Sequence, residues 1–306
     1  MSSTTTSTPA SSRTEQLERD MFFDVSHCAL VLLKGPDSLD LLHRISTNDL
    51  LHLSVGASSQ TILTNEKGRI VEVVSVVRIS ADELLLAGCS SDDEGLDHWL
   101  NKFIIMEDAK TSIVKSLYKQ LIITSSNTQI LQKLMQLSSE SVYAFKENWG
   151  REQWLRLIVR NGTIEFRNVL GSLHEGRDDE FDEYRIKAGI PAYPNELSPQ
   201  VNPLEVNLAH LVSFTKGCYV GQEVIARLDT YSKVQKQLCR FRLTGLPQFV
   251  PAPIVRDGEE AGTLTSAIHS PAVGSAIGLG FLTIKAIQAG TSFQLAEKGI
   301  GLKLQS

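Results

Sequence analysis

The sequence, 306 residues long, lacks the patterns of several large classes of protein. No apolar run approaches the roughly 18 residues that a membrane-spanning helix needs, so we expect no membrane segment. No Gly-rich phosphate loop is present, and the seven histidines form no H-x-x-x-H pair. The chain also has few cysteines, and none form a C-x-x-C pair: Cys28, Cys89, Cys218 and Cys239. These absences exclude a disulfide framework and leave no reason to expect a resident metal site.

The charged residues are nearly balanced, with 35 acidic and 30 basic side chains and a net charge of −5. This balance gives no general attraction to a phosphate backbone, so we expect no direct nucleic-acid binding. Hydrophobic residues make up 42% of the chain, which is typical of a globular protein. A chain of this mass is long enough for one large core or for about two to three smaller ones.

The start of the chain differs in composition from the rest. Residues 2–13 are nearly all Ser, Thr, Pro and Ala, and they lack the apolar stretch of a secretory signal. Transit peptides are rich in arginine, whereas Arg13 is the only basic residue here. We therefore predict a disordered tail over residues 1–20 and expect a cytoplasmic protein, with a mitochondrion or plastid as the alternative.

Residues 21–235 mix helix and strand patterns, and we expect two interwoven lobes there. Leu39, Leu42 and Ile45 recur at helical spacing and predict a helix that begins near Ser38. Further helices are predicted after Ser90-Ser91 and over 128–137 and 181–188. Strands are predicted at 29–33, 60–64, 70–79, 83–87, 113–114, 120–124, 154–159 and 163–166, the last two as a hairpin around Asn161-Gly162.

From residue 236 onward the pattern changes to short strands separated by Gly and Pro. We predict them at 238–243, 254–256, 262–269, 276–282 and 292–295. Such spacing is typical of a small β-barrel or sandwich, which we expect as a separate C-terminal domain over residues 236–306. The whole chain is thus expected to be an α+β protein with antiparallel sheets.

Residues 212–227, V-S-F-T-K-G-C-Y-V-G-Q-E-V-I-A-R, carry the strongest functional signal. The apolar spacing in and after this segment predicts a helix that begins near Tyr219. Cys218 would then lie at a helix N-terminus, two residues after Lys216, and both the helix field and the lysine charge would favour its thiolate. Cys218 is therefore the candidate reactive cysteine, with Lys216 promoting the thiolate.

Plainer interpretations of the same residues stay open. A cysteine flanked by Tyr219 and Val220 is often a small buried hydrophobe, and no histidine partner is apparent for ordinary thiol hydrolysis. Glu223 and Arg227 have the i, i+4 spacing of a salt bridge on a helix, which is a simpler explanation than catalysis.

The block K-G-C-Y-V-G-Q-E-V-I-A-R resembles the signature of the YgfZ-type folate-binding proteins, relatives of the glycine cleavage T-protein, an aminomethyltransferase. Four further segments resemble this superfamily in the same order, and together they cover nearly the whole chain after Met21. They are G-P-D to T-N-D at 35–49, L-T-N-E-K-G-R-I at 63–70, Y-R-I-K-A-G-I-P at 184–191 and G-T-L-T-S-A-I-H-S-P at 262–271.

The resemblance implies a three-lobed T-protein-like fold with a C-terminal β-barrel and a central channel for tetrahydrofolate or a one-carbon derivative. It also implies a role in iron–sulfur cluster assembly or maintenance, with client or assembly proteins as partners and a transient cluster as a second group to consider. The matching positions become candidate site residues: Asn65, Lys216, Gly217, Cys218, Tyr219, Gly221, Gln222 and Glu223. By position alone, Arg69, Arg227 and Lys233 are candidates to hold the anionic glutamate tail, and Tyr219 to stack on the pterin.

One departure from the T-protein pattern leaves two hypotheses open. The T-protein hairpin carries G-G-x-x-D-D, where an aspartate assists chemistry at the folate nitrogens, but residues 68–73 here read G-R-I-V-E-V. Glu72 is the only acid left, and Lys187 stands where the T-protein motif has Glu. The first hypothesis is a folate-binding accessory protein without turnover. The alternative is a tetrahydrofolate-dependent aminomethyl or one-carbon transferase that uses Glu72.

Overall fold

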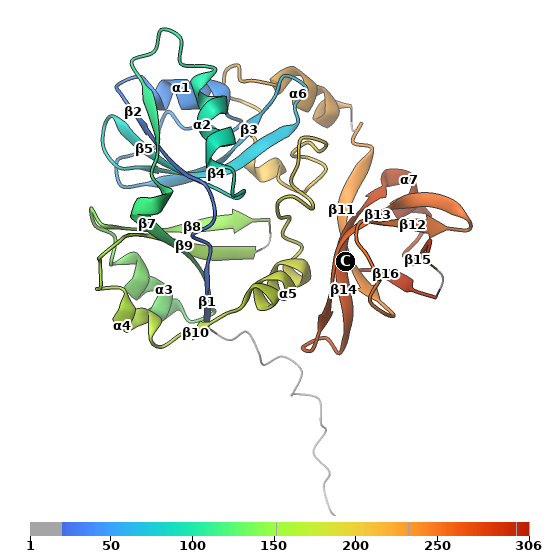
Figure 1. Cartoon of the computed structure of the whole chain (residues 1–306). Helices are drawn as coiled ribbons and strands as arrows, with labels where there is room; N and C mark the ends of the chain where they lie inside the picture. Colours follow the sequence, from blue (N-terminus) through green and yellow to red (C-terminus); the bar gives the residue numbers. More distant parts are fainter. Residues whose placement is uncertain (1–19, 151, 232, 298, 306) are drawn as a thin grey trace, which may run out of the picture.

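The computed structural model describes residues 20–150, 152–231, 233–297 and 299–305. These residues form three lobes: two lobes that each combine a sheet with helices are stacked on one side of the molecule, and a β-barrel lies on the other (Figure 1). The tail predicted over residues 1–20 lies outside the described residues, apart from Asp20.

The first lobe is a five-stranded antiparallel sheet that two helices cover on one face. In β2, Val31 and Leu33 pack with the helices, whereas Leu30 faces the other way. The same alternation occurs in β5, where Leu86 packs with the helices and Leu85 faces away. The strands, in spatial order, are β3 (Ser58–Thr64), β4 (Ile70–Arg78), β5 (Glu83–Gly88), β2 (Leu30–Lys34) and β6 (Lys110–Ile113), and the helices are α1 (Ser38–Ile45) and α2 (Asp93–Asn101).

The second lobe repeats this plan around another five-stranded sheet. In β9, Leu155 and Leu157 pack with the helices of this lobe, and Ile158 faces the first lobe. The pair β10–β1 is parallel, and the other described pairs of this sheet are antiparallel. In spatial order the strands are β10 (His174–Glu175), β1 (Met21–Asp24), β7 (Tyr118–Thr124), β9 (Glu152–Arg160) and β8 (Val142–Trp149), and the helices are α3 (Thr128–Met135) and α4 (Arg167–Leu170).

The two sheets pack against each other through the faces that carry no helices. Leu30, Val77 and Leu85 of the first sheet form one buried cluster with Phe145 and Ile158 of the second. From top to bottom in Figure 1 the layers are therefore helix, sheet, sheet and helix. Both faces of the central strands are buried, which explains why these strands are almost continuously apolar in the sequence.

The third lobe is a closed barrel, so the expected α+β fold with a C-terminal barrel is confirmed. Phe241, Leu264 and Phe293 lie among its buried core residues. The last strand of the barrel, Gly301–Gln305, was not predicted from the sequence. The strands in order around the barrel are β11 (Lys236–Leu243), β14 (Ser275–Thr283), β13 (Glu259–Ser270), β12 (Ala252–Arg256), β15 (Ser292–Leu295) and β16 (Gly301–Gln305), and α7 (Ile284–Ala289) follows β14.

One apolar cluster joins the three lobes. It includes Ile62 of the first sheet, Ile122 of the second and Phe281 of the barrel. Ile186 of α5 (Asp178–Ala188) and Leu197 of the segment after it complete the junction. The lobes therefore cannot separate without exposing this cluster to water.

Some predicted elements differ from the structure; for example, the helix expected over 181–188 begins at Asp178, and the strand expected at 113–114 covers Lys110–Ile113. The hairpin around Asn161-Gly162 is wrong, because β9 pairs instead with the unpredicted β8 and residues 163–166 form no strand. The helix expected directly after Ser90-Ser91 begins at Asp93, since the Asp92 carboxylate accepts a hydrogen bond from the Gly95 amide and caps it. The helix expected near Tyr219 begins at Gln222.

The start of α6 (Gln222–Thr230) is pressed against the turn between β3 and β4. Gly221 has a φ of +80°, and a Cβ there would lie 2.4 Å from the Asn65 carbonyl oxygen and 2.9 Å from Gly68 Cα. The Thr64 hydroxyl also donates to the Val220 carbonyl, at 2.6 Å. Glycine is thus required at position 221 both for its backbone conformation and for the close approach.

Gly221→Ala should lower the free energy of unfolding by about 2 to 4 kcal/mol, because it adds a left-handed alanine and a backbone clash. Gly217→Ala is the matched control in the same segment: no atom lies within 4 Å of the added Cβ, so we expect a change below about 0.5 kcal/mol. Urea denaturation of both variants tests this, and equal stabilities would show that the helix start is not held by this contact.

Candidate functional site

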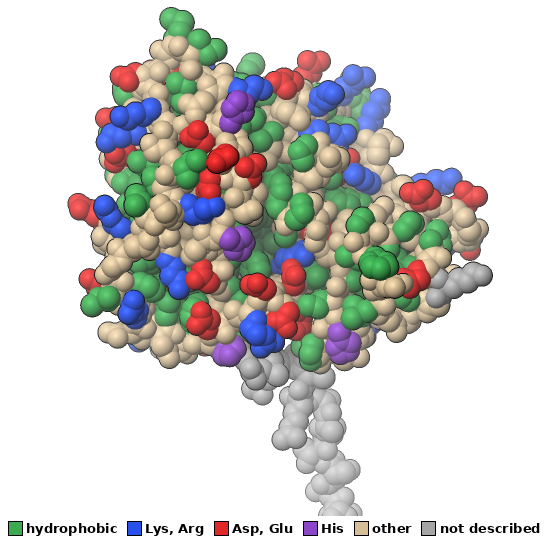
Figure 2. Space-filling model, in the orientation of Figure 1, with side chains coloured by type: hydrophobic (Ala, Val, Ile, Leu, Met, Phe, Trp, Pro, Cys, Tyr) green, Lys and Arg blue, Asp and Glu red, His purple; other side chains and the backbone are tan. Residues whose placement is uncertain are grey.

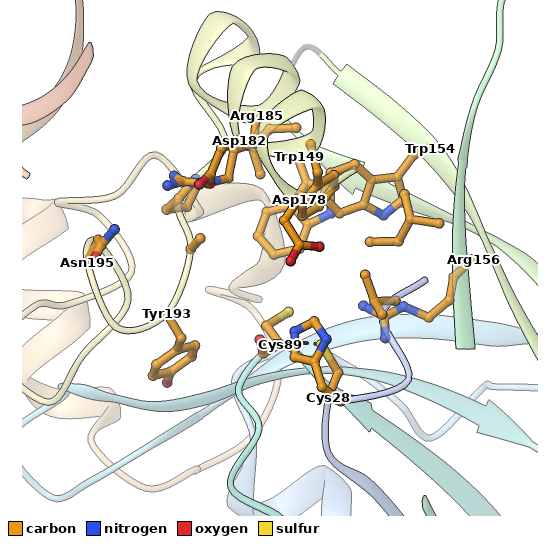
Figure 3. Close-up of a pocket in the computed structure, with 17 residues that line it drawn as sticks. Cys28, Cys89, Trp149, Trp154, Arg156, Asp178, Asp182, Arg185, Tyr193 and Asn195 are labelled. Carbon is orange, nitrogen blue, oxygen red and sulfur yellow. Dashed lines mark hydrogen bonds and ion pairs between the residues drawn. The ribbon is translucent and has the colours of Figure 1, made fainter. Parts of the chain in front are cut away.

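A cavity of about 310 Å³ lies where the two sheets meet α5 and the segment after it (Figure 3). Its walls come from the loop after β1, the ends of β5 and β8, the strands β7 and β9, the helix α5 and residues 190–195. The residues that line it include His27, Cys28, Cys89, Trp149, Trp154, Arg156, Asp178, Phe181, Asp182, Arg185, Tyr193 and Asn195.

Aromatic side chains form one wall of the cavity. The ring centroids of Trp149 and Trp154 are 5.4 Å apart, and those of Trp154 and Phe181 are 5.8 Å apart, with all three rings tilted relative to one another. Trp154 is held in place because its indole N–H donates to Glu147 Oε2, at 2.5 Å. Such a wall suits a flat, largely apolar ring system.

A buried ion pair lies beside this wall. Arg156 Nε is 2.6 Å from Glu147 Oε1, and both side chains are almost fully buried. Glu147 also accepts a hydrogen bond from the Ser75 hydroxyl at 2.6 Å, and Arg156 Nη1 donates to Gln120 Oε1 at 3.1 Å. Burial lowers the pKa of Arg156, but attraction to Glu147 outweighs it and the net shift is upward. Sequence reasoning missed this pair, although a lone arginine inside the apolar run W-L-R-L-I-V could have indicated it.

A second buried arginine connects the cavity to the barrel. Arg185 Nε donates to Asp182 at 2.5 Å, its Nη1 to Glu196 at 3.1 Å and its Nη2 to the Ser266 hydroxyl on β13 at 3.1 Å. Glu196 is fully buried and also accepts a hydrogen bond from Ser266 at 2.7 Å. This network fixes α5 and the following segment against the barrel.

Two of the four cysteines line the cavity. Cys28 Sγ is 3.8 Å from the Cys89 carbonyl oxygen, and Figure 3 shows the two side chains beside each other, with Arg156 reaching toward them. Burial raises the pKa of Cys28 to about 11 and the pKa of Cys89 well above its usual range. Both are therefore neutral thiols at physiological pH.

Glu72 does not line the cavity. Glu72 pairs with Leu63 on the neighbouring strand and, by strand alternation, lies on the face that carries α1 and α2, as Val74 does. Glu72 Oε1 accepts hydrogen bonds from the amides of Val73 and Cys89, both at 3.0 Å, and Ser90 at 3.3 Å, while Oε2 accepts one from the Ser90 hydroxyl. Burial raises its pKa.

The K-G-C segment lies outside the cavity, and its lysine has a structural contact. Lys216 Nζ donates to the carbonyls of His43 at 2.5 Å, Asn48 at 2.6 Å and Ser46 at 2.7 Å, all at or just after the end of α1. It also lies 5.5 Å from the Tyr219 ring centroid. Burial lowers the pKa of Lys216 to about 8, against the attraction of Asp49. Cys218 itself is exposed.

The other predicted site residues are also placed away from the cavity. Tyr219 is buried, and its main-chain amide donates a hydrogen bond to Gln222 Oε1, at 3.3 Å. Asn65 and Gly221 meet at the β3–β4 turn. Among the described residues no ion pair joins Glu223 to Arg227, so the expected salt bridge is not formed. These two residues line a small hollow on α6 together with Lys233, whereas Arg69 pairs with Glu205 at 3.1 Å.

The part of the chain that the structure describes contains no group of three or more His, Cys, Asp or Glu side chains that could hold a metal ion. None of its helices is long and apolar enough to cross a membrane. On the face seen in Figure 2, acidic and basic side chains are interspersed rather than gathered into one field of a single sign.

Comparisons with known proteins identify the family. The GCVT N-terminal domain matches residues 16–157, and the glycine cleavage T-protein C-terminal barrel domain matches residues 236–302. An aminomethyltransferase of Listeria monocytogenes is 30% identical, over 85% of this chain and 77% of the relative. An aminomethyltransferase of Aquifex aeolicus is 27% identical, over 90% of this chain and 79% of the relative. A putative chloroplastic transferase of Arabidopsis thaliana is 26% identical, over 91% of this chain and 69% of the relative.

A solved structure has the same fold. The crystal structure of the glycine cleavage system aminomethyltransferase T from Bartonella henselae matches with a TM-score of 0.79, at 17% identity, over 94% of this chain and 85% of that one. This likeness confirms the T-protein-like arrangement of the lobes. Because both domain models match in chain order and a 30% identical relative is covered over most of its length, the chain belongs to the glycine cleavage T-protein family.

Proposed function

We propose that this protein binds tetrahydrofolate, or a one-carbon derivative of it, in the cavity and supports the assembly or repair of iron–sulfur clusters in client enzymes. The observation that carries the proposal is a separation of two sites. None of the K-G-C residues lines the cavity, and the Cys218 thiol is exposed outside it. A ligand site and a thiol that a partner protein can reach are the two features such an accessory protein needs.

The residues of the cavity fit the ring system of a folate. The rings of Trp149, Trp154 and Phe181 offer stacking faces. Arg156, Asp178 and Asn195 supply hydrogen-bonding groups at other points of the wall. The volume of about 310 Å³ lies at the lower end of the range for ligand sites, roughly 300 to 1,000 Å³, so it suits the ring system with the glutamate tail outside.

Cys218 suits a transient role. Iron–sulfur clusters generally take four protein ligands, so one exposed thiol cannot hold a cluster by itself. Cys28 and Cys89 line the cavity instead, and Cys239 is half-buried in the barrel. The thiol would therefore act with groups supplied by a partner, for a cluster, a sulfur atom or a partner cysteine.

A one-carbon transferase is the second candidate, because several relatives are named aminomethyltransferases. That chemistry needs an acid within hydrogen-bond reach of the folate nitrogens. Glu72 was the expected acid, but its carboxylate is committed to three main-chain amides and a serine hydroxyl, and Glu72 does not line the cavity. This placement favours the accessory role.

Cys218→Ser should leave folate affinity unchanged within about twofold, because the thiol lies outside the cavity, and should abolish support of cluster enzymes. Calorimetric titration with tetrahydrofolate and 5-formyl-tetrahydrofolate, together with client activity in cells that lack the protein, measures both. Absence of binding by the unmutated protein would remove folate from the function. Full client activity of the variant would remove the thiol from it.

Lys216→Met should lower the free energy of unfolding by about 1 to 3 kcal/mol, because three carbonyls lose their shared donor. Alkylation of Cys218 by a small reagent should become faster, since the segment loses its anchor on α1. Lys233→Met, at an exposed lysine near the end of α6, is the control and should change neither value. An alkylation rate equal to that of the unmutated protein would contradict the anchoring role.

Glu72→Gln should fold with a stability within about 1 kcal/mol of the unmutated protein, because an amide oxygen can accept the same main-chain hydrogen bonds and the amide nitrogen can donate to Ser90. Neither protein should transfer an aminomethyl group to tetrahydrofolate. Transfer by the unmutated protein that the substitution removes would establish the transferase instead.

A further inference from the structure

The Arg156 side chain has one nitrogen, Nη2, that has no partner in the part of the chain that the structure describes and is not fully enclosed. Its Nε faces Glu147, and its Nη1 donates to Gln120 and, more distantly at 3.4 Å, to the Gly88 carbonyl. No partner of Nη2 is found among the described residues. Nη2 is nevertheless not fully enclosed by protein, even though only 1% of the residue as a whole is exposed. Arg156 lines the cavity (Figure 3), and Nη2 is its only nitrogen that is neither bonded to a described residue nor fully enclosed, so Nη2 is the atom that a ligand can reach.

The charge of this guanidinium is already compensated. Glu147 lies 2.6 Å away, is itself buried and is held by Ser75 and Trp154, so the pair is fixed and neutral overall. A second carboxylate next to the pair would leave one uncompensated negative charge in a buried site, which is costly. Nη2 therefore favours a neutral acceptor atom over an anion.

The residues around Nη2 indicate which part of a ligand would contact it. Cys28 and Cys89 lie beside the guanidinium, and Figure 3 shows Arg156 pointing toward them. Burial raises the pKa of both thiols and so keeps them protonated. A protonated thiol is only a weak hydrogen-bond donor. Trp154 precedes Arg156 by two residues on β9, so its ring and the guanidinium lie on the same face of the sheet. A flat ring stacked on the aromatic wall would thus turn its edge toward Arg156.

We propose that Arg156 Nη2 donates a hydrogen bond to an uncharged carbonyl oxygen of the bound folate and so determines which folates the cavity accepts. This inference rests on the proposed folate binding. A folate offers such an oxygen in two places, the 4-oxo group of the pterin ring and the formyl group of a one-carbon derivative. An amino group in place of this oxygen would direct its N–H donors at the N–H donors of Nη2, and no hydrogen bond could form.

The first experiment uses the unmutated full-length protein and calorimetry with matched ligands. Tetrahydrofolate is compared with its 4-amino analogue, and with 5-formyl-tetrahydrofolate. If the ring oxygen is the acceptor, the 4-amino analogue should bind roughly 10- to 100-fold more weakly. If the formyl oxygen is the acceptor, the formyl derivative should bind at least about tenfold more tightly than tetrahydrofolate, with no difference between the 4-oxo and 4-amino forms.

Equal binding of all three ligands, within twofold, would overturn the inference and leave the proposed function standing. Binding of none of them would overturn both.

Variants test whether Arg156 is responsible. Arg156→Met alone would leave the Glu147 charge buried without its partner, so the test uses Glu147→Gln together with Arg156→Met, which removes both charges. The double variant should keep its circular dichroism spectrum and bind the discriminated ligands within twofold of one another. Lys146→Met, at an exposed lysine on β8 next to Glu147, is the control and should keep the full discrimination. A folded double variant that still discriminates would overturn the assignment to Arg156.

Discussion

The structure depends on the junction at which the three lobes share one apolar cluster. The two sheets bury their inner faces against each other, and the cluster around Ile62, Ile122 and Phe281 extends this contact to the barrel. None of the lobes can cover its part of the cluster alone, so the three must assemble for any of them to be fully buried. The cavity lies at the same junction because α5 and the segment after it do not fill the whole space between the lobes.

Two buried arginines make this junction specific. Arg156 pairs with Glu147 between the sheets, and Arg185 pairs with Glu196 where α5 meets the barrel. Each pair also takes part in further hydrogen bonds, for example from Ser75 to Glu147 and from Ser266 to Glu196. Buried pairs of this kind add little net stability, but shifting one lobe against another would leave a charge unpaired. They therefore fix the position of the cavity walls more than they strengthen the fold.

Much of the architecture could be predicted from the sequence because the apolar patterns of its elements are strong. The helix near Ser38, the strands β3 to β5 and the barrel follow directly from spacing and from Gly and Pro. The strand β8 could not be predicted in this way. Its buried position 147 is an acid, Glu147, between the exposed Lys146 and Asn148, so the sequence shows no alternation of apolar and polar residues there. The turn residues Asn161-Gly162 then indicated a hairpin after β9, but β9 pairs with β8 instead.

The candidate site was harder to predict, for a physical reason that Glu72 and Arg156 illustrate together. Strand alternation places Glu72 beside Val74, but the amides of Cys89 and Ser90, from a later part of the chain, bind its carboxylate, and no local pattern announces that contact. Arg156 can be buried only because it pairs with Glu147, which lies on a neighbouring strand, and the sequence does not show this pairing. The K-G-C motif identified the family, yet its lysine binds the end of α1 and its cysteine faces solvent. A motif can therefore mark a functional surface while the ligand cavity is built from residues that carry no motif at all.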